Sequence, residues 1–244
     1  MIGVILAAGI GKRLMPLTEH IPKTLVKIQE KTILEHIVTN LVDCGIQEIC
    51  VVVGHGKGSV VSETDRLSKI FNCGFKIVEN ENYLSTNTGY SLLRAFNCLE
   101  KSDEIVVVNG DTVFDQRILK KLVKCDRTSI VVDNVKDLTD ESFKVKIVPG
   151  GRIVAIGKQL SIADSTGEFI GLSLIQKENT VFFKEILEDL VEDDPHQYYD
   201  IAFKKLSESN PIGSVYTDGL IWTEIDYFSD LEYAKQHWTT LNQN

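Results

Sequence analysis

Two glycines and three basic residues follow the first apolar run of the chain, Ile2–Ala7. They are Gly9, Gly11, Lys12, Arg13 and Lys23. Glycine lets backbone amides approach a phosphate closely, and lysine and arginine neutralise its charge. Residues 1–31 hold five basic and two acidic residues, although the whole chain has a net charge of −9. The sequence therefore predicts a small anionic ligand at this loop.

Two well-known phosphate loops do not match this segment. A dinucleotide-binding fingerprint needs a third glycine where Leu14 stands, and a Walker A loop needs glycine at Leu6 and serine or threonine at Arg13. For the glycine pair alone, a tight turn between a strand and a helix is an equal alternative. The basic residues favour the phosphate site.

Two aspartates follow predicted strands elsewhere in the chain. Asp111 comes after Glu104–Val108, and Asp226 comes after Ile221–Ile225. Ligands of open α/β sheets bind beyond the carboxyl ends of the strands, and Mg²⁺ is commonly held by one or two carboxylates together with substrate phosphates. Asp111 and Asp226 are therefore well placed to share a magnesium ion. The alternative for an aspartate after a strand is to cap the next turn or helix.

That alternative is what we expect of two other acids. Asp115 fits a turn residue, and Asp230 fits an acid in the first turn of a last helix, which begins near Ser229. Neither is expected to bind a ligand.

Apolar periodicity predicts the elements that must position these residues. Short runs rich in valine and isoleucine are typical of strands buried on both faces. In the first half they are Ile2–Ala7, Glu48–Val53, Phe75–Val78, Glu104–Val108 and Ser129–Val132. One apolar stripe predicts a helix from Thr32 to Cys44, with Thr32 as its cap and Gly45 at its end. A strand, a helix and a second strand in this order form a βαβ unit.

The second half has more closely spaced strands. They are Phe143–Val148, Arg152–Ile156, Phe169–Ile175 and Ile221–Ile225, with helices at Thr180–Val191 and Tyr198–Leu206. Pro149, Gly150 and Gly151 predict a hairpin turn between the first two strands of this group. The pattern predicts one α/β domain with a mostly parallel central sheet and a β-rich insertion in its second half.

Composition excludes several classes of protein. The 244 residues are 43% hydrophobic and 25% charged, which is typical of a globular chain and not of a fibre or a disordered segment. No apolar run approaches the roughly 20 residues of a membrane span, so we expect a cytoplasmic protein. The net charge of −9 argues against general nucleic-acid binding. Five cysteines without a CxxC pair predict neither disulfides nor a zinc site.

The first thirty residues resemble a known superfamily. Leu-Ala-Ala-Gly-x-Gly-x-Arg-Leu-x-Pro-Leu-Thr, from Leu6, and Pro-Lys-x-Leu-Val, from Pro22, resemble the nucleotidylyltransferases that activate phosphorylated sugars and small alcohols. The resemblance implies a Rossmann-like three-layer fold whose loop wraps a nucleoside triphosphate. It places Arg13 on the phosphates and Lys23 near the reacting phosphoryl group, with Lys12, where many relatives have serine or threonine, as a further phosphate contact.

The same resemblance implies further site residues. Gly110–Asp111 and Glu224–Asp226 resemble the segments that supply metal ligands. Asn87–Leu92, which otherwise fits a helix cap, resembles the segment that meets the base in small cytidylyltransferases acting on phosphocholine, related phosphonates or inositol phosphate. The implied nucleotide-binding residues are Leu6, Ala7, Ala8, Gly9, Gly11, Lys12, Arg13, Asn87, Gly89, Tyr90, Ser91 and Gly110.

The acceptor side is implied by a lysine after a strand. Lys158 matches the superfamily lysine that binds the acceptor phosphate, and Glu168 and Asp200 are candidates for the acceptor's polar or cationic part. Tyr198, Tyr199 and Trp222 could form an aromatic cage for a quaternary ammonium, but aromatics at such spacing more often belong to a core. His55 receives no role.

The sequence thus predicts Mg²⁺-dependent transfer of a nucleotidyl group from CTP to a small phosphorylated or phosphonate acceptor, with Arg13, Lys23 and Lys158 as catalytic residues. The nucleotide part would span about 1–135 and the acceptor part about 136–220 of a single domain, 1–244, and a homodimer is one option. The alternatives are a sugar-1-phosphate uridylyl- or thymidylyltransferase, a glycosyltransferase and a catalytically silent regulatory subunit. A glycosyltransferase is disfavoured because no second acid follows Asp111 two residues on.

Overall fold

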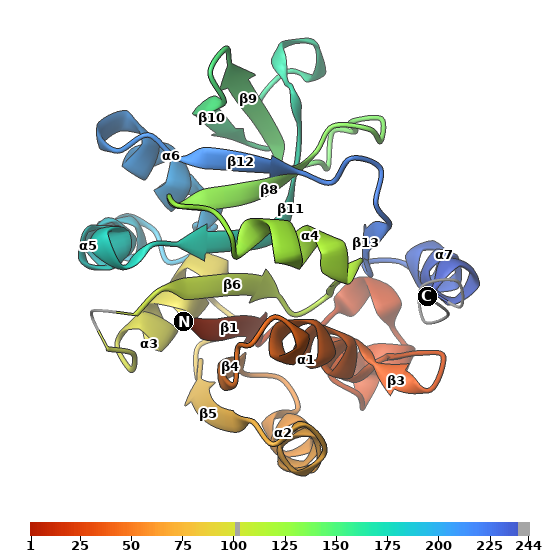
Figure 1. Ribbon diagram of the computed structural model, residues 1–244. Helices are drawn as coiled ribbons and strands as arrows, with labels where there is room; N and C mark the ends of the chain where they lie inside the picture. The colour runs from red at the N-terminus through yellow and green to blue at the C-terminus, as the bar shows by residue number, and fades with distance from the viewer. Residues whose placement is uncertain (101–102, 239–244) are drawn as a thin grey trace.

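A nine-stranded sheet forms the centre of the molecule in the computed structural model, which describes residues 1–100 and 103–238 (Figure 1). Its strands are β1 (Ile2–Ala7), β4 (Glu48–Val53), β5 (Gly74–Glu79), β6 (Ile105–Asn109), β8 (Ser129–Asp133), β9 (Lys144–Val148), β10 (Arg152–Gly157), β11 (Gly167–Ile175) and β12 (Gly213–Tyr216). The main path runs β10-β9-β11-β6-β1-β4-β5; β8 branches from it at β11, and β12 pairs with β8.

The two halves of the sheet differ in strand direction. β5, β4, β1 and β6 are parallel neighbours. β11 runs antiparallel to β6, β8 and β9, and β9 and β10 form an antiparallel hairpin. The hairpin turn lies where the sequence predicts it, because Gly150 and Gly151 have positive φ angles of 93° and 77°. The predicted parallel core and β-rich second half are confirmed.

Helices cover both faces of the sheet (Figure 1). One face packs on α1 (Ile33–Asp43), α2 (Lys57–Phe71), α4 (Gln116–Leu122) and α7 (Phe228–His237), and the other on α3 (Thr88–Phe96), α5 (Lys177–Asp193) and α6 (Asp200–Ser209). Successive strand residues point to opposite faces, so Ile5 lies in the first apolar cluster and Val4 in the second. The result is the three-layer architecture expected from the sequence.

The first helix follows its predicted caps. The Thr32 side chain accepts a hydrogen bond of 3.0 Å from the Glu35 amide, and Gly45 follows the helix with a φ of 83°. This βαβ unit fixes the loop after β1 at the carboxyl edge of the parallel strands.

The last predicted strand, Ile221–Ile225, is not part of the central sheet. It forms β13 (Trp222–Glu224), which pairs antiparallel with β7 (Thr112–Phe114) in a separate two-stranded sheet. The Ile225 amide also donates to the Asp111 carbonyl at 3.0 Å. The small sheet, and not the edge of the large one, therefore brings the second predicted metal-binding segment beside the first. A second small hairpin joins β2 (Lys27–Ile28) and β3 (Lys31–Thr32).

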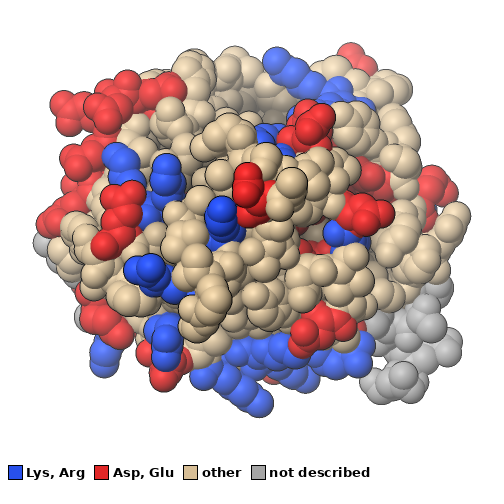
Figure 2. Space-filling view, turned by 90° about the horizontal axis from the view of Figure 1, so that it is seen from above, with Lys and Arg blue, Asp and Glu red and all other residues tan. Residues whose placement is uncertain are grey.

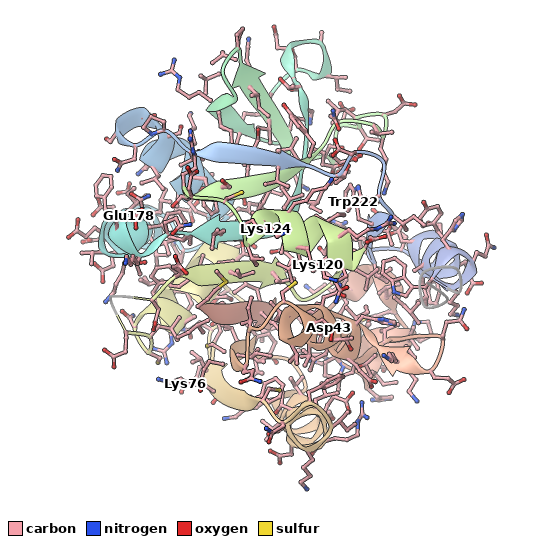
Figure 3. The ribbon with its side chains drawn as sticks, in the orientation of Figure 1. Asp43, Lys76, Lys120, Lys124, Glu178 and Trp222 are labelled. Atoms are coloured by element: carbon pink, nitrogen blue, oxygen red, sulfur yellow. The ribbon has the colours of Figure 1, made fainter. Side chains whose placement is uncertain are left out.

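Charge is unevenly spread over the surface. In the view from above, lysine and arginine side chains gather along the edge on which α4 lies (Figure 2). Lys120 lies on α4 and Lys124 follows its end, and both side chains are exposed (Figure 3). Within residues 1–100 and 103–238, no helix has the length and hydropathy that a membrane crossing requires.

Candidate active site

The loop after β1 is held in shape by a glycine and a threonine. Gly11 has a φ of 72°, and a Cβ atom there would lie 3.0 Å from the Cβ of Lys23. The buried Thr18 hydroxyl donates to the Gly11 carbonyl at 2.7 Å. The loop then continues into a short 3₁₀ turn, η1 (Lys12–Leu14), that leaves Lys12 and Arg13 exposed. Gly11 and Lys23 are therefore packed together, as a shared phosphate site requires.

Another glycine allows two strand ends to meet. The Gly110 amide donates to the Leu6 carbonyl at 2.9 Å, and a Cβ at Gly110 would lie only 2.5 Å from that oxygen. Any larger residue would force β1 and β6 apart just before Asp111. Leu6 and Gly110, both predicted nucleotide-binding residues, are thus direct neighbours.

Four predicted site residues form one charged cluster. The Lys23 Nζ lies 2.6 Å from Asp111 Oδ2 and 2.5 Å from Asp226 Oδ1. Arg13 Nη1 lies 2.7 Å from Asp226 Oδ2. The Arg13 guanidinium stacks over the Tyr227 ring, with its Cζ 5.3 Å from the ring centre. The structure therefore brings the basic loop and both aspartates together, although β1, β6 and β13 supply them from distant parts of the sequence.

Each charge in this cluster changes the protonation of its neighbours. Burial opposes the charge of Lys23, but Asp111 and Asp226 outweigh it and raise the pKa of Lys23 above its ordinary value. Burial likewise raises the pKa of Asp226, and Lys23 and Arg13 outweigh it, so the pKa of Asp226 is lowered overall. Both groups are charged at neutral pH.

A third carboxylate completes a candidate metal site. Oxygen atoms of Asp111, Glu224 and Asp226 lie within 4.8 Å of one another. Asp111 Oδ1 is buried and has no hydrogen-bond partner among the described residues. Hard carboxylate oxygens with a spare ligand position suit Mg²⁺, so these residues fit the ion that the sequence predicts. Asp226 is held in place by Asp230, whose carboxylate accepts from the Asp226 amide at 2.9 Å, in the helix-start role expected of Asp230.

Glu224 belongs to a segment that the sequence singles out, but its own side chain is not predicted as a ligand. Crowding by surrounding protein atoms, together with repulsion from Asp111, raises the pKa of Glu224 to about 8, although solvent reaches the residue. A carboxyl group in such a position gains most from a nearby cation. Glu224 lies opposite Thr112 in the pairing of β7 with β13, and this pairing places it beside Asp111. The sequence alone does not show the pairing.

The start of α3 is tied to the loop before α6. The Gly89 amide donates to the Gln197 carbonyl at 3.1 Å, and the Asn87 side chain caps the helix by accepting from the Thr88 amide at 2.8 Å. Ser91 accepts at 3.0 Å from Asn80, a buried residue that sequence analysis does not identify. The expected helix cap at Asn87 is confirmed.

Lys158 follows β10, in the part of the chain that the sequence predicts to bind the acceptor. Its Nζ lies 3.0 Å from Glu141 Oε2 and 5.3 Å from the centre of the Phe143 ring. Phe143 in turn meets the edge of Tyr198, with ring centres 5.0 Å apart. Glu141 also interacts electrostatically with Arg13 and Asp226. The ion pair with Glu141 therefore connects Lys158 electrostatically to the charged cluster.

Two other predicted acceptor residues, Asp200 and Glu168, are acids that are partly or fully buried. Burial raises the pKa of Asp200 to about 7, and Asp200 Oδ2 has no hydrogen-bond partner within the described part of the chain. Burial also raises the pKa of Glu168, against the lowering effects of Ser142 and Lys136. Lys158 lowers the pKa of Asp200 by its charge, so the two predicted acceptor residues are electrostatic neighbours.

The three candidate cage aromatics do not enclose one pocket. Tyr199 and Trp222 are 1% and 5% exposed and belong to apolar clusters on opposite faces of the sheet. The Trp222 ring, on β13 next to α7 (Figure 3), is covered by the Lys136 ammonium 3.9 Å from its centre. Tyr198 alone is exposed. The core alternative is therefore correct for Tyr199 and Trp222, because each ring fills space between a helix layer and a strand.

Two other residues behave as caps or supports. Asp115 accepts from the Arg117 amide at 2.8 Å and starts α4, as expected. The His55 amide donates to the Ala8 carbonyl at 3.2 Å, so the loop after β4 supports the glycine loop. Among the described residues His55 Nε2 has no hydrogen-bond partner.

Comparison with known proteins gives consistent matches. The profile of the family described as "Nucleotidyl transferase" matches residues 2–140. The CTP:phosphoglutamine cytidylyltransferase of Campylobacter jejuni is 30% identical over 95% of this chain and 98% of that protein. The bifunctional protein GlmU of Methanococcus maripaludis is 29% identical over 97% of this chain, which spans only 54% of that protein.

A solved structure shares the fold over nearly its whole length. The CTP:phosphocholine cytidylyltransferase of Streptococcus pneumoniae (LicC) superposes with a TM-score of 0.78 and 23% identity, covering 96% of this chain and 98% of that one. At this identity the likeness concerns the arrangement of helices and strands.

Proposed function

The chain belongs to the nucleotidyl transferase family, as its motifs predict, and from this membership we propose that it transfers a cytidylyl group from CTP to a small phosphorylated or phosphonate acceptor, releasing pyrophosphate. The observation that carries the proposal is the contact of Lys23 with both Asp111 and Asp226, with Arg13 beside them. Cations that neutralise phosphates and carboxylates that hold a metal are the two parts that phosphoryl chemistry needs.

The reaction requires alignment more than activation. An acceptor phosphate oxygen attacks the α-phosphorus of CTP in line, a new P–O bond forms, and the bond to the β-phosphate oxygen breaks as pyrophosphate leaves. The attacking oxygen is already an anion at neutral pH, so no general base is needed. The enzyme must hold two anions together and stabilise the charge of the transferring group. Arg13 and Lys23 are placed for the second task.

The carboxylates Asp111, Glu224 and Asp226 would hold Mg²⁺, which when bound neutralises charge on the triphosphate. For this the Lys23 ammonium must share or leave its contacts with Asp111 and Asp226, since it lies between them. A triphosphate supplies the alternative partner for Lys23 and for the exposed Arg13.

The acceptor half would bind the second substrate. We assign the acceptor phosphate to Lys158, whose side chain is 36% exposed and forms an ion pair with the exposed Glu141. Asp200 and Glu168 would meet the acceptor's polar or cationic part, because a buried carboxyl group with a raised pKa gains from a donor or a cation. In this proposal the nucleotide part is about 1–135 and the acceptor part about 136–220.

The choice of CTP and of a small acceptor draws on the relatives. One acts on phosphoglutamine with CTP by its name, and the fold neighbour acts on phosphocholine. A sugar-1-phosphate uridylyl- or thymidylyltransferase, the alternative named from the sequence, stays the second candidate. A cytoplasmic location and a homodimer stay predictions from the sequence.

A pyrophosphate-release screen tests the proposal. CTP, UTP, dTTP, ATP and GTP are each offered with Mg²⁺ against phosphocholine, aminoethylphosphonate, inositol phosphate and several sugar-1-phosphates. We expect release only with CTP and one small acceptor. Release with UTP or dTTP and a sugar phosphate would keep the chemistry and replace the substrates. Nucleotide binding without turnover would favour a regulatory subunit.

A further inference from the structure

Lys144, on β9, is a lysine with its charged end inside the protein. The residue is 2% exposed, whereas Lys146, two positions along the same strand, is exposed. Removing an ammonium group from water is costly unless all of its donors find partners. Its position therefore needs a structural or functional reason.

All three donors of Lys144 can be satisfied by backbone carbonyls. Its Nζ donates to the carbonyls of Asp140 and Ser142 at 3.1 Å each and to the carbonyl of Lys158 at 2.8 Å. An ammonium has three N–H donors and no acceptor, so these contacts use its full capacity. These hydrogen bonds connect the loop before β9 with Lys158, the residue after β10. Both lie outside the regular strand pairing of β9 and β10.

These two segments carry the side chains of the acceptor half. Glu141 lies between the two carbonyls of the first segment, and its carboxylate holds the Lys158 Nζ at 3.0 Å. Phe143, next along the chain, lies under the same Nζ. Lys144 thus fixes the backbone of Lys158 from inside while Glu141 and Phe143 meet its side chain from outside.

The chain needs such a fixing point because it turns sharply here. Gly157, the last residue of β10 and the strand partner of Lys144, has a φ of 148°, and a Cβ there would lie 2.5 Å from the Gln159 side chain. The residues after Gly157 leave the sheet, so the β ladder no longer constrains Lys158. Its carbonyl is held by Lys144 instead.

We propose that Lys144 is a positioning residue, which sets the place of Lys158 for the acceptor through the three carbonyls that it joins. The proposal rests on the proposed function in that Lys158 binds the acceptor phosphate. A purely structural role of Lys144 would predict that its loss weakens folding and lowers the affinity for both substrates equally. A positioning role predicts a lower affinity for the acceptor alone.

Lys144→Met tests the proposal because it keeps the length of the side chain and removes the three donors. Lys146→Met, on the same strand but exposed, is the matched control. In steady-state pyrophosphate release, we expect Lys144→Met to raise the KM for the acceptor about tenfold while the KM for CTP changes less than about twofold. Lys146→Met should change neither. Equal increases in both KM values, or no increase, would overturn the proposal.

A double-mutant cycle separates positioning from general damage. If Lys144 acts through Lys158, adding Lys144→Met to Lys158→Met should change the acceptor KM by less than about twofold further. An additive tenfold effect would mean that Lys144 acts independently of Lys158. Should Lys144→Met fold poorly, Lys144→Gln keeps two of the three donors on a shorter side chain, and a smaller increase of the same kind is expected.

A readout without turnover keeps this test distinct from the proposed function. The rate at which an amine-directed reagent modifies Lys158, followed by mass spectrometry, should rise severalfold in Lys144→Met and stay unchanged in Lys146→Met. Faster labelling in a protein that shows no transferase activity would contradict the function and keep the positioning role. Unchanged labelling of Lys158 in Lys144→Met would contradict the positioning role in an active or an inactive enzyme.

Discussion

Lys23 and Asp111 are separated by 88 positions in the chain, yet the ammonium of one lies 2.6 Å from the carboxylate of the other. The contact joins the loop after β1 to the end of β6, and Asp226 completes it from β13. In the proposed nucleotidyl transfer, each side of this contact has a different task. The lysine suits the phosphates, and the aspartate suits the metal.

Asp111→Asn tests the metal side of this contact. The amide keeps the shape of the side chain but loses the charge that a divalent cation needs, so we expect kcat to fall by roughly 10²- to 10³-fold, in line with other losses of a transition-state charge partner. The variant weakens the ion pair with Lys23 but also removes the repulsion of Glu224, so we expect only a small change in stability. Pyrophosphate release and thermal unfolding measure the two effects. Near-normal turnover would contradict the metal assignment.

Lys158→Met tests the acceptor side. The lost positive charge should raise the KM for the acceptor by about 10- to 100-fold. CTP binding, measured by calorimetry, should keep its Kd because Lys158 lies in the proposed acceptor part. Lys146→Met serves again as the exposed control. A weaker affinity for CTP in Lys158→Met would place this lysine on the nucleotide.

Thr18→Val tests the support of the glycine loop. Valine keeps the buried shape but removes the donor to the Gly11 carbonyl, so we expect a loss of about 1 kcal/mol in unfolding free energy and a higher KM for the triphosphate. Thr24→Val is the matched control, since the Thr24 hydroxyl is buried without a partner in the described residues. It should be neutral or stabilising. Equal losses in the two variants would show that the Gly11 contact has no special role.

Asp200→Asn tests the buried carboxyl group through pH. Burial raises the pKa of Asp200 from 3.8 to about 7 in the folded protein, so the folded state holds a proton that the unfolded state releases. This group therefore stabilises the fold fully below about pH 4, and its contribution is lost as pH rises to about 7. Over that window the wild type should lose on the order of 4 kcal/mol relative to Asp200→Asn. Parallel pH profiles in urea unfolding would contradict the raised pKa.

Much of the fold could be predicted from local patterns. β1 and β4 have the bounds that the valine and isoleucine runs indicate, and α1 begins after Thr32 and ends before Gly45. These elements can be predicted because strands buried on both faces, and helix caps, have characteristic residue patterns. The apolar pattern of α2 is weak, because Val60 and Leu67 are its only fully buried apolar residues. Apolar periodicity therefore does not predict this helix.

The site could be predicted only in part, for a related reason. Arg13, Lys23, Asp111 and Asp226 follow from motifs, and the structure brings them together. The pairing of β13 with β7 was not predictable, because strands of three residues carry no pattern of their own. Lys144 and Lys146 alternate with Val145 and Ile147, so the pattern predicts the same exposed face for both lysines. Only the loop folded over Lys144 makes the difference.

The most direct test of nucleotidyl transfer at this site follows the phosphorus atoms themselves. ³¹P NMR of a mixture of enzyme, Mg²⁺, CTP and the acceptor found in the screen should show pyrophosphate and a new cytidylyl product with a P–O–P linkage appearing in equal amounts, and neither should appear at a comparable rate with Asp111→Asn. Release of inorganic phosphate without such a product, or equal product formation by Asp111→Asn, would contradict the account.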